Sequence, residues 1–186
     1  MRIISGRLKG KAFNFLKNLT TRPLKDSVKE NIFNILEHSN LINIKIEKAN
    51  ILDLYSGIGS FGLECISRGA KKVTFVEKDK NALIILKNNL IKLSITDKAK
   101  IVEEKIENAI NKKIEKYNIF FLDPPFKDKE FINNLFLIKK NKLYQNKHVI
   151  IIHRDKSSSD PIDDYLDVII EKKYGRSKII FGILAK

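Results

Sequence analysis

Between residues 50 and 153, short apolar segments alternate with amphipathic segments of helical spacing. The apolar segments are typical of strands that are buried on both faces of a parallel sheet. The alternation therefore predicts an α/β fold, in which helices cover both faces of a mostly parallel sheet. The predicted strands are residues 50–55, 71–79, 99–104, 117–123 and 147–153, and the predicted helices are residues 60–69, 81–93, 105–114 and 128–141.

The last part of the chain departs from this alternation. Residues 165–186 contain two β-type segments around "KKYGRSK", and the few residues between them cannot form a crossover helix. The two segments therefore predict an antiparallel hairpin that closes the sheet. Together with the preceding five strands, this hairpin makes a seven-stranded sheet.

The first 40 residues precede the alternating pattern and carry many basic side chains. The segment "RIISGRLKGKAF" predicts a β-hairpin with Arg7, Lys9 and Lys11 at its tip. Ser27 and Glu30 have the spacing of a capping box, which predicts an amphipathic helix over residues 27–38. We therefore expect a basic extension, residues 1–40, and an α/β domain, residues 41–186.

The formal net charge of the chain is +14, which indicates a polyanionic partner such as nucleic acid. The abundance of Lys, Ile and Asn also fits A/T-rich codons, so the charge alone leaves the partner open. No apolar run reaches 18 residues and the N-terminus lacks the features of a signal peptide, so we expect a cytoplasmic protein without membrane contact. A single cysteine, Cys65, and three scattered histidines predict packing for the thiol and neither a disulfide nor a metal site.

The segment "DLYSGIGSFG" places Gly57, Gly59 and Gly62 at G-x-G-x-x-G spacing after the first predicted strand. Such glycines let a ligand approach the backbone at the start of a helix, and an acid about 20 residues later can accept hydrogen bonds from ribose hydroxyls. Glu77 lies 20 residues after Gly57, at the end of the second predicted strand. The pattern predicts a nucleoside-binding loop, but by itself it also fits nicotinamide and flavin dinucleotides.

Asp53 favours one class of ligand over the others. It lies four residues before Gly57, at the strand tip, where its carboxylate would repel a pyrophosphate and attract a cation. S-adenosylmethionine has no phosphate and carries an ammonium, a sulfonium and a ribose, so it suits Asp53, the glycines and Glu77. The alternative is that Asp53 only caps the following turn.

The fourth predicted strand ends in "FFLDPPF", where Asp123 precedes two prolines and an aromatic ring. The prolines fix φ and remove two N–H donors, which leaves the Asp123 carboxylate and the carbonyls of Asp123 and Pro124 as acceptors. This arrangement suits the exocyclic amine of a nucleobase, because hydrogen bonds from both amine hydrogens favour a tetrahedral nitrogen with an available lone pair. Phe126 would stack on the base. Alternatively, the prolines only end the strand and Phe126 belongs to the core.

Together, "DLYSGIGSFGLECISRG", the strand end at Glu77 and "DPPF" resemble class I S-adenosylmethionine-dependent methyltransferases that act on exocyclic amines. With "RIISGRLKGKAF" and "RPLKDSVKENIFNIL", the chain is similar to the bacterial 16S rRNA guanine-N2 methyltransferases that are named for guanine 966. The resemblance runs from Arg2 to about Phe126 and more loosely through the closing hairpin. It implies a Rossmann-like fold, S-adenosylmethionine as cofactor, a monomer, and 16S rRNA in a small ribosomal subunit or its precursor as partner.

The resemblance also implies roles for particular residues. Arg22, Pro23, Asp26 and Glu30 match the family's loop and helix beside the site. The cofactor is expected to contact Asp53, Tyr55, Gly57, Gly59, Glu77, Lys78 and Ile106, and the target guanine to contact Asp123, Pro124, Pro125 and Phe126. The RNA is expected to contact Arg7, Lys9, Lys11, Arg22, Lys25 and Lys29, unless these residues form only a solvated basic face.

The chain departs from the family's pattern at several positions. Ile58 and Leu24 stand where the family has hydroxyl residues, and Lys105 stands where many relatives have an acid or amide near the adenine. The adenine is therefore expected to be held by backbone near Lys105 and Ile106. His153 replaces an acid that is expected after the fifth strand.

Three other functions stay open at the level of sequence. The same chemistry could act on adenine N6 or on a base in other RNA or DNA, because "DPPF" does not distinguish exocyclic amines. A dinucleotide-dependent oxidoreductase would share the glycine loop, but Asp53, the basic N-terminus and "DPPF" count against it. A catalytically inactive RNA-binding or assembly factor would share the scaffold, and the intact Asp123 and glycines count against that function.

Overall fold

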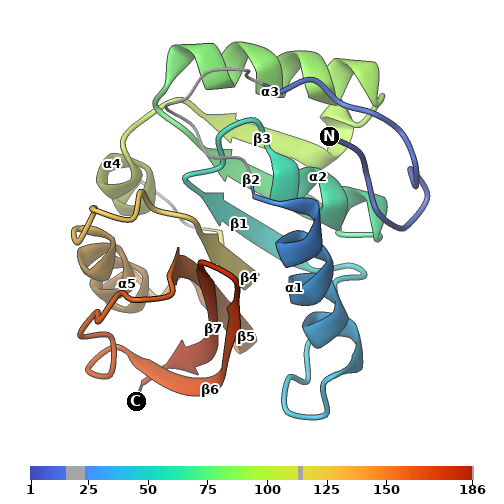
Figure 1. Cartoon of the computed structure of the whole chain (residues 1–186). Helices are drawn as coiled ribbons and strands as arrows, with labels where there is room; N and C mark the ends of the chain where they lie inside the picture. Colours follow the sequence, from blue (N-terminus) through green and yellow to red (C-terminus); the bar gives the residue numbers. More distant parts are fainter. Residues whose placement is uncertain (16–23, 113–114, 186) are drawn as a thin grey trace.

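The computed structural model describes residues 1–15, 24–112 and 115–185, and it contains a seven-stranded sheet between two layers of helices (Figure 1). Within the described residues, no helix combines the length and the apolar composition that a membrane span needs. The elements in chain order are α1 Asp26–His38, β1 Asn50–Leu54, α2 Ser60–Ser67, β2 Lys72–Val76, α3 Lys80–Lys92, η1 Thr96–Lys98, β3 Ala99–Val102, α4 Ile106–Asn111, β4 Tyr117–Leu122, α5 Phe131–Lys140, β5 Tyr144–Asp155, β6 Leu166–Tyr174 and β7 Ser177–Leu184.

The strand order is β3-β2-β1-β4-β5-β7-β6, with β1 to β5 parallel and β7 antiparallel to both of its neighbours. The predicted α/β sheet with a closing antiparallel hairpin is therefore confirmed. The chain leaves β1 toward β2 on one side and returns from β3 to β4 on the other side. This change of direction makes the carboxyl ends of β1 and β4 a switch point, where doubly wound sheets bind ligands.

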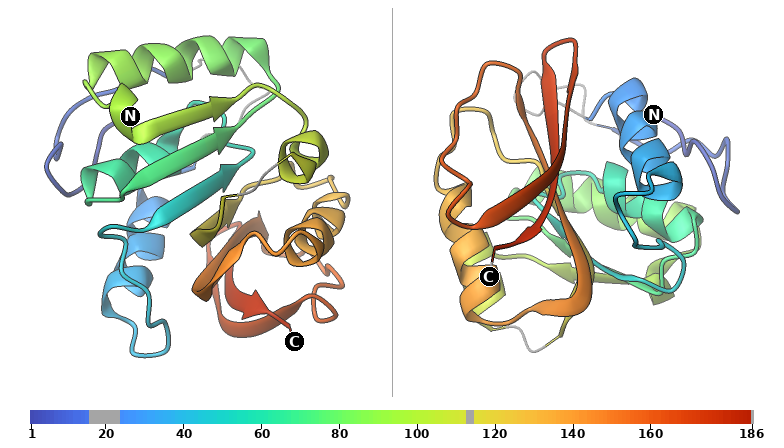
Figure 2. Two further views of the ribbon diagram at one scale, coloured as in Figure 1. Left: turned by 180° about the vertical axis from the view of Figure 1, so that it is seen from behind. Right: turned by 90° about the horizontal axis from the view of Figure 1, so that it is seen from below.

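Alternate residues of the central strands face opposite layers of helices. Ile51 and Phe121 belong to a buried cluster with residues of α1, α2 and α3. Leu52 and Phe120 belong to a second buried cluster with α4 and α5. Burial on both faces explains why the strands read as continuous apolar runs. Figure 2 shows the sheet from behind and from below, with helices on either side.

The N-terminal segment reverses its direction, but it does not form the two strands that we expected. Arg2 and Ala12 make a single antiparallel bridge, and turns occupy the residues between them. The tip packs closely on α2, so a Cβ on Gly6 would lie only 2.1 Å from the Ser67 carbonyl oxygen. Gly6 also has a φ of +80°, which other residues rarely adopt. Backbone hydrogen bonds between its two arms, such as Ile3 N–H to the Lys11 carbonyl (3.0 Å), and packing on α2 together shape this segment.

The predicted capping box at Ser27 and Glu30 is wrong. Helix α1 begins at Asp26 and its N-cap is Lys25, without a side-chain cap hydrogen bond. Ser27 therefore lies inside the first turn. The helix is stabilised instead by its apolar face, on which Val28 and Ile32 are buried.

A buried acid in α2, Glu64, connects this helix to the N-terminal segment and to α1. Its carboxylate accepts hydrogen bonds from the backbone N–H groups of Ile4 (2.8 Å) and Ser5 (2.9 Å) and from Nε of Arg68 (3.0 Å). Nζ of Lys29 lies 3.9 Å from the same carboxylate, and both side chains are fully buried. The RNA contact that we predicted for Lys29 does not fit this burial, which gives the residue a structural role.

The division at residue 40 stays a prediction. Buried residues before it, such as Ile3 and Ile32, share a cluster with buried residues after it, such as Ile51.

Candidate active site

The glycine loop connects β1 to α2 at the switch point of the sheet. Gly57 and Gly59 have φ values of +54° and +87°, so both need the left-handed conformation that glycine adopts without strain. Gly62 has a different role, because a Cβ there would lie 2.3 Å from the ring of Phe75. The first two glycines therefore shape the loop, and the third lets α2 approach β2.

Asp53 is buried beneath this loop, where Oδ2 accepts a hydrogen bond from the backbone N–H of Gly62 (3.0 Å). The capping role that the sequence left open is thus present, and a ligand contact of Asp53 stays a prediction. Burial raises the pKa of Asp53 well above its ordinary value, and the charges of Asp123 and Glu77 raise it further, whereas the Gly62 hydrogen bond lowers it. An added positive charge would therefore stabilise the ionised form.

Glu77 lies at the end of β2, beside the glycine loop. Oε2 accepts a hydrogen bond from the N–H of Gly57, and Oε1 accepts from the N–H groups of Lys78 and Asp79, each over 2.8 Å. Asp79 in turn caps α3 by accepting from the N–H of Ala82. These contacts fix the carboxylate at the edge of the loop, while the Lys78 side chain is exposed.

Two further features suit a polar, cationic ligand at this edge. The Ser60 hydroxyl, at the first position of α2, is buried without a hydrogen-bond partner among the described residues. The carboxylates of Asp53, Glu77 and Asp123 gather at the ends of neighbouring strands, which favours a positive charge between them. The Ser60 hydroxyl and these carboxylates therefore fit S-adenosylmethionine, the cofactor that the sequence predicted.

Tyr55 connects the cofactor loop to the region after β4. Its φ of +60° is unusual for a residue other than glycine. Its hydroxyl accepts a hydrogen bond from Nδ2 of Asn134 in α5 (2.9 Å). Burial raises its pKa, with a further contribution from Asp128, so the phenol stays protonated. Ile106, expected near the adenine, is buried at the start of α4.

Asp123 follows β4, and a histidine on β5 holds it. Oδ1 of Asp123 lies 2.8 Å from Nδ1 of His153, whose Nε2 lies 2.9 Å from the hydroxyl of Ser177 at the start of β7. The ring of Phe126 meets the His153 ring edge-on, with centroids 5.6 Å apart. The structure thus brings Asp123 and Phe126 together around His153.

Arg154, the next residue of β5, holds the backbone of the same loop. Its guanidinium donates to the carbonyl oxygens of Pro125 and Phe126, each over 3.1 Å, and forms two hydrogen bonds with Asp160. It also stacks on Phe131, 4.5 Å from the ring centroid. The Pro124 carbonyl is a different acceptor, and no described residue donates to it. Of the acceptors that the sequence predicted, the Pro124 carbonyl has no donor among the described residues, whereas the Asp123 carboxylate already faces Nδ1 of His153.

The predicted RNA-contacting residues lie at several places. Arg7, Lys9 and Lys11 are exposed, but the N–H of Arg7 donates to the carbonyl of Ser67 at the end of α2 that is opposite the glycine loop. Eight helical residues separate these ends by about 12 Å. Lys25 is exposed at the start of α1. Arg22, with Pro23 of the family's loop, lies outside the described residues.

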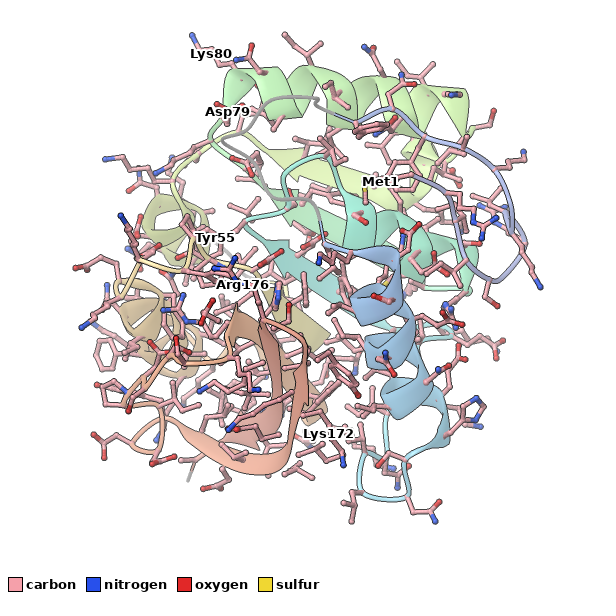
Figure 3. The ribbon with its side chains drawn as sticks, viewed as in Figure 1. Met1, Tyr55, Asp79, Lys80, Lys172 and Arg176 are labelled. Atoms are coloured by element: carbon pink, nitrogen blue, oxygen red, sulfur yellow. The ribbon has the colours of Figure 1, made fainter. Side chains whose placement is uncertain are left out.

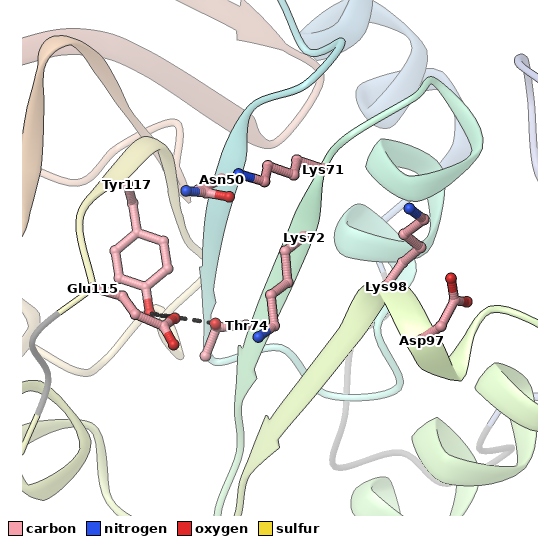
Figure 4. Close-up of a pocket in the computed structure, with 8 residues that line it drawn as sticks. All are labelled: Asn50, Lys71, Lys72, Thr74, Asp97, Lys98, Glu115 and Tyr117. Atoms are coloured by element: carbon pink, nitrogen blue, oxygen red, sulfur yellow. Dashed lines mark hydrogen bonds between the residues drawn. The ribbon is translucent and has the colours of Figure 1, made fainter.

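A pocket of about 410 Å³ opens at the opposite edge of the sheet, among the amino ends of β1, β2 and β4 (Figure 4). Asn50, Lys71, Lys72 and Glu115 contribute to its lining, and the Tyr117 hydroxyl is hydrogen-bonded to Thr74 (3.3 Å). None of the predicted cofactor or catalytic residues lines it. The pocket is therefore separate from the site at the carboxyl ends.

Comparison with known proteins identifies the family to which this fold and site belong. A family model described as "Conserved hypothetical protein 95" matches residues 1–183. The chain belongs to this family. A relative named "Ribosomal RNA small subunit methyltransferase D", from Buchnera aphidicola subsp. Baizongia pistaciae, is 32% identical over 183 residues, which are 98% of this chain and 90% of the relative. The family is one of class I methyltransferases.

Other known proteins are similar to the chain in sequence and in structure. The Escherichia coli K12 protein of the same name is 29% identical over 161 residues, which are 87% of this chain and 78% of that protein. The solved structure of yhhF from Escherichia coli, a proposed methyltransferase, superimposes with a TM-score of 0.83 at 27% identity and covers 98% of this chain and 96% of its own.

Sequence patterns did not reveal several residues that support the site. Arg154 and Ser177 lie on strands whose register only the folded sheet defines. Asn89 in α3 is buried and bonded to the backbone of Asn14 and of Ile58 in the glycine loop. Glu64 did leave a signal in the sequence, because it is a charged residue inside the otherwise apolar "FGLECIS" helix, and such a residue is rarely buried without a partner.

Proposed function

We propose that the chain transfers a methyl group from S-adenosylmethionine to the exocyclic N2 of a guanine in small-subunit (16S) rRNA. The observation that carries the proposal is the placement of Asp123, Pro124 and Phe126 at the end of β4, next to the glycine loop of β1. Relatives that are named as small-subunit rRNA methyltransferases support methylation of small-subunit rRNA.

Binding of the methyl donor is assigned to the loop residues. S-adenosylmethionine would supply an activated methyl group on a positively charged sulfur. Glu77 accepts two backbone N–H groups on Oε1 and one on Oε2, so Oε2 keeps an acceptor site for a ribose hydroxyl. Asp53 would add negative charge near the cationic part of the ligand. A dinucleotide would bring its pyrophosphate toward these acids, which disfavours an oxidoreductase.

The catalytic residues act mainly by positioning. One amine hydrogen of the base would bond to Oδ2 of Asp123, since Oδ1 already faces His153. The second would bond to the Pro124 carbonyl. Both bonds would favour a tetrahedral nitrogen. Its lone pair is then not delocalised into the ring and can attack the methyl carbon. As the N–C bond forms, the S–CH₃ bond of the donor would break, with its electron pair staying on the sulfur of the leaving S-adenosylhomocysteine. The amine would then lose one proton to the partly exposed Asp123 or to water.

Phe126 is suited to support the base. Its ring is only partly buried and lies at 82° to the His153 ring, with the ring centroids 5.6 Å apart. We propose that the target base stacks on this ring. Stacking of this kind contributes on the order of 1 to 3 kcal/mol per base. We infer that the base leaves its helix to reach this ring, in a cytoplasmic small subunit or its precursor, and that the enzyme acts as a monomer.

A labelling experiment tests the proposal. The protein is incubated with radiolabelled S-adenosylmethionine and small ribosomal subunits that lack the modification, and the labelled nucleotide is mapped. Label on N2 of one guanine supports the proposal. Label on adenine N6 would reassign the target while keeping the chemistry, and the absence of label would reject methyl transfer to this RNA.

A further inference from the structure

The turn between β6 and β7 lies at the catalytic edge of the sheet. Ser177, the first residue of β7, pairs with Asp155 at the carboxyl end of β5, because β7 runs antiparallel to β5. Tyr174 pairs with Ser177, so Gly175 and Arg176 form a two-residue turn. Gly175 has a φ of +58°, as tight hairpin turns require. In Figure 3, Arg176 in this turn is labelled together with Tyr55 at the end of β1.

The turn is also connected to the catalytic carboxylate. Ser177 follows Arg176 directly, and its hydroxyl lies 2.9 Å from Nε2 of His153. The other nitrogen of the same ring lies 2.8 Å from Asp123. Any partner that lies along the turn is therefore close to the base that Asp123 would hold.

The charges around the turn are mainly positive. We call the exposed cations Lys156, Lys172, Lys173 and Arg176 the catalytic-edge basic patch. Lys173 lies 3.4 Å from Glu171, whereas the described residues offer Lys172 and Arg176 no carboxylate partner. The N–H of Lys156 donates to the Arg176 carbonyl, which holds the patch together. An anion could therefore bind Lys172 and Arg176 without displacing an existing ion pair.

Lys172 faces the side of the sheet on which the site opens. In the β6–β7 register, Lys172 pairs with Ile179 and Tyr174 pairs with Ser177. Ile179 belongs to the buried cluster beneath α1 and α2, so Lys172 shares that face with the half-buried Tyr174. The right-hand view of Figure 2 shows the turn and the start of α1 projecting on the same side of the molecule.

Arg7 and Lys29, two of the cations predicted to contact RNA, do not offer the same proximity. Arg7 is held at the end of α2 that lies away from the glycine loop, and Lys29 is buried. We propose that the catalytic-edge basic patch binds the phosphates of the RNA strand that flanks the target base. This inference rests on the proposed function for the identity of the RNA, and it places the strand across the end of β5 and β7.

Filter binding of an unmodified 16S rRNA transcript to the full chain tests the inference. The test variant is Lys172→Ser with Arg176→Ser, and the matched control is Lys71→Ser with Lys72→Ser at the opposite edge, which removes the same charge. Each lost phosphate contact lowers affinity roughly threefold and the salt slope by about 0.7. We therefore expect the test variant to bind about tenfold more weakly at low salt, with a slope reduced by roughly 1.4, and the control to match the wild type.

Equal binding by the test variant and the control would overturn the inference. Binding of phosphatidylserine vesicles, but not of the transcript, through Lys172 and Arg176 would also overturn it. Methyl transfer is measured separately on the same preparations. A patch-dependent salt slope without any methyl transfer would reject the proposed reaction and keep the RNA-binding surface.

Discussion

Oδ1 of Asp123 lies 2.8 Å from Nδ1 of His153, and Nε2 of that ring lies 2.9 Å from the Ser177 hydroxyl. A carboxylate oxygen accepts hydrogen bonds, so Nδ1 of His153 is the donor to Asp123. The acid that the family pattern predicted at residue 153 would repel Asp123, whereas histidine fixes its orientation. His153 is therefore a positioning residue for Asp123.

Replacing His153 with Leu removes this donor, and we expect kcat for methyl transfer to fall roughly 10- to 150-fold, the loss of a hydrogen bond to a charged group. His153→Asn keeps an N–H donor and should restore most of kcat. The KM for RNA should change little in either variant. His148→Asn, at a half-buried histidine that bonds to Gln145 and Leu184, is the control. Similar kcat values for the Leu and Asn variants would contradict the positioning role.

Asp123 itself should be needed for the reaction but not for binding of the donor. We expect Asp123→Ala to lower methyl transfer by a factor of about 100 to 1000 or more, because the amine loses its charged acceptor. The Kd for S-adenosylmethionine in calorimetry should stay within about twofold, since Glu77 and the glycine loop are intact. Asp163→Asn, at an exposed acid, serves as control. A variant that keeps most of its rate would show the assignment to be wrong.

Glu77 is expected to bind the ribose, and it also fixes the glycine loop. Glu77→Ala removes the acceptor for the N–H groups of Gly57, Lys78 and Asp79, so both donor affinity and thermal stability should fall. Glu77→Gln keeps an amide oxygen for some of these bonds and should preserve more of the stability than of the affinity. Calorimetry and thermal unfolding of the two variants separate the roles. An unchanged Kd in both would reject the ribose contact.

The sequence predicted the sheet well because burial on both faces leaves a plain signal. Continuous apolar runs such as Ile119 to Leu122 are strands in the structure, and the short link at Gly175 allowed only a hairpin. The prediction of a capping box at Ser27 was wrong, because it used only the spacing of Ser27 and Glu30. The position of the buried apolar face of α1 was not considered. Lys29 was misjudged for a related reason, since helical spacing alone does not reveal that a lysine faces a buried carboxylate.

The site was predictable only in part. Asp123, the prolines and Glu77 stand at strand ends, where sequence motifs mark them. Their partners come from elements far along the chain, such as His153 on β5 and Ser177 on β7. The parallel register of β4 and β5 brings His153 to Asp123, and the antiparallel register of β5 and β7 brings Ser177 to His153. One sequence does not specify these registers. Arg154 was missed for the same reason, because its role appears only when β5 lies beside the loop after β4.

The buried contact between Glu64 and Lys29 should be important for stability. Glu64→Ala leaves the Lys29 ammonium with only the exposed Asp26 as counter-charge (3.4 Å) and frees two backbone N–H groups, so we expect a loss of about 3 to 5 kcal/mol in the free energy of unfolding. Adding Lys29→Met should recover part of it, because no buried charge is then left unpaired. Urea unfolding measures both variants. Glu37→Ala, at the exposed partner of Arg68, is the control.

Additive losses in the double variant would contradict this account. If Glu64→Ala with Lys29→Met were as unstable as the sum of the single variants, the two groups would not be coupled.

The raised pKa of Asp53 predicts a pH dependence of stability. Burial, aided by Asp123 and Glu77, makes the folded state bind the Asp53 proton more tightly than the unfolded chain, whose ordinary value is 3.8. The unfolded state then holds fewer protons as pH rises above 3.8, so the free energy of unfolding falls until the folded-state pKa is passed. Asp53→Asn keeps an acceptor for the Gly62 N–H and should remove this fall.

Urea unfolding across a pH series compares the wild type, Asp53→Asn and the exposed control Asp97→Asn. We expect the stability of Asp53→Asn relative to the wild type to increase as pH rises, while the control follows the wild type. The same substitution should weaken binding of S-adenosylmethionine, because the cationic ligand stabilises the ionised Asp53. Parallel stability curves for Asp53→Asn and the wild type would show that Asp53 titrates alike in the folded and unfolded chains.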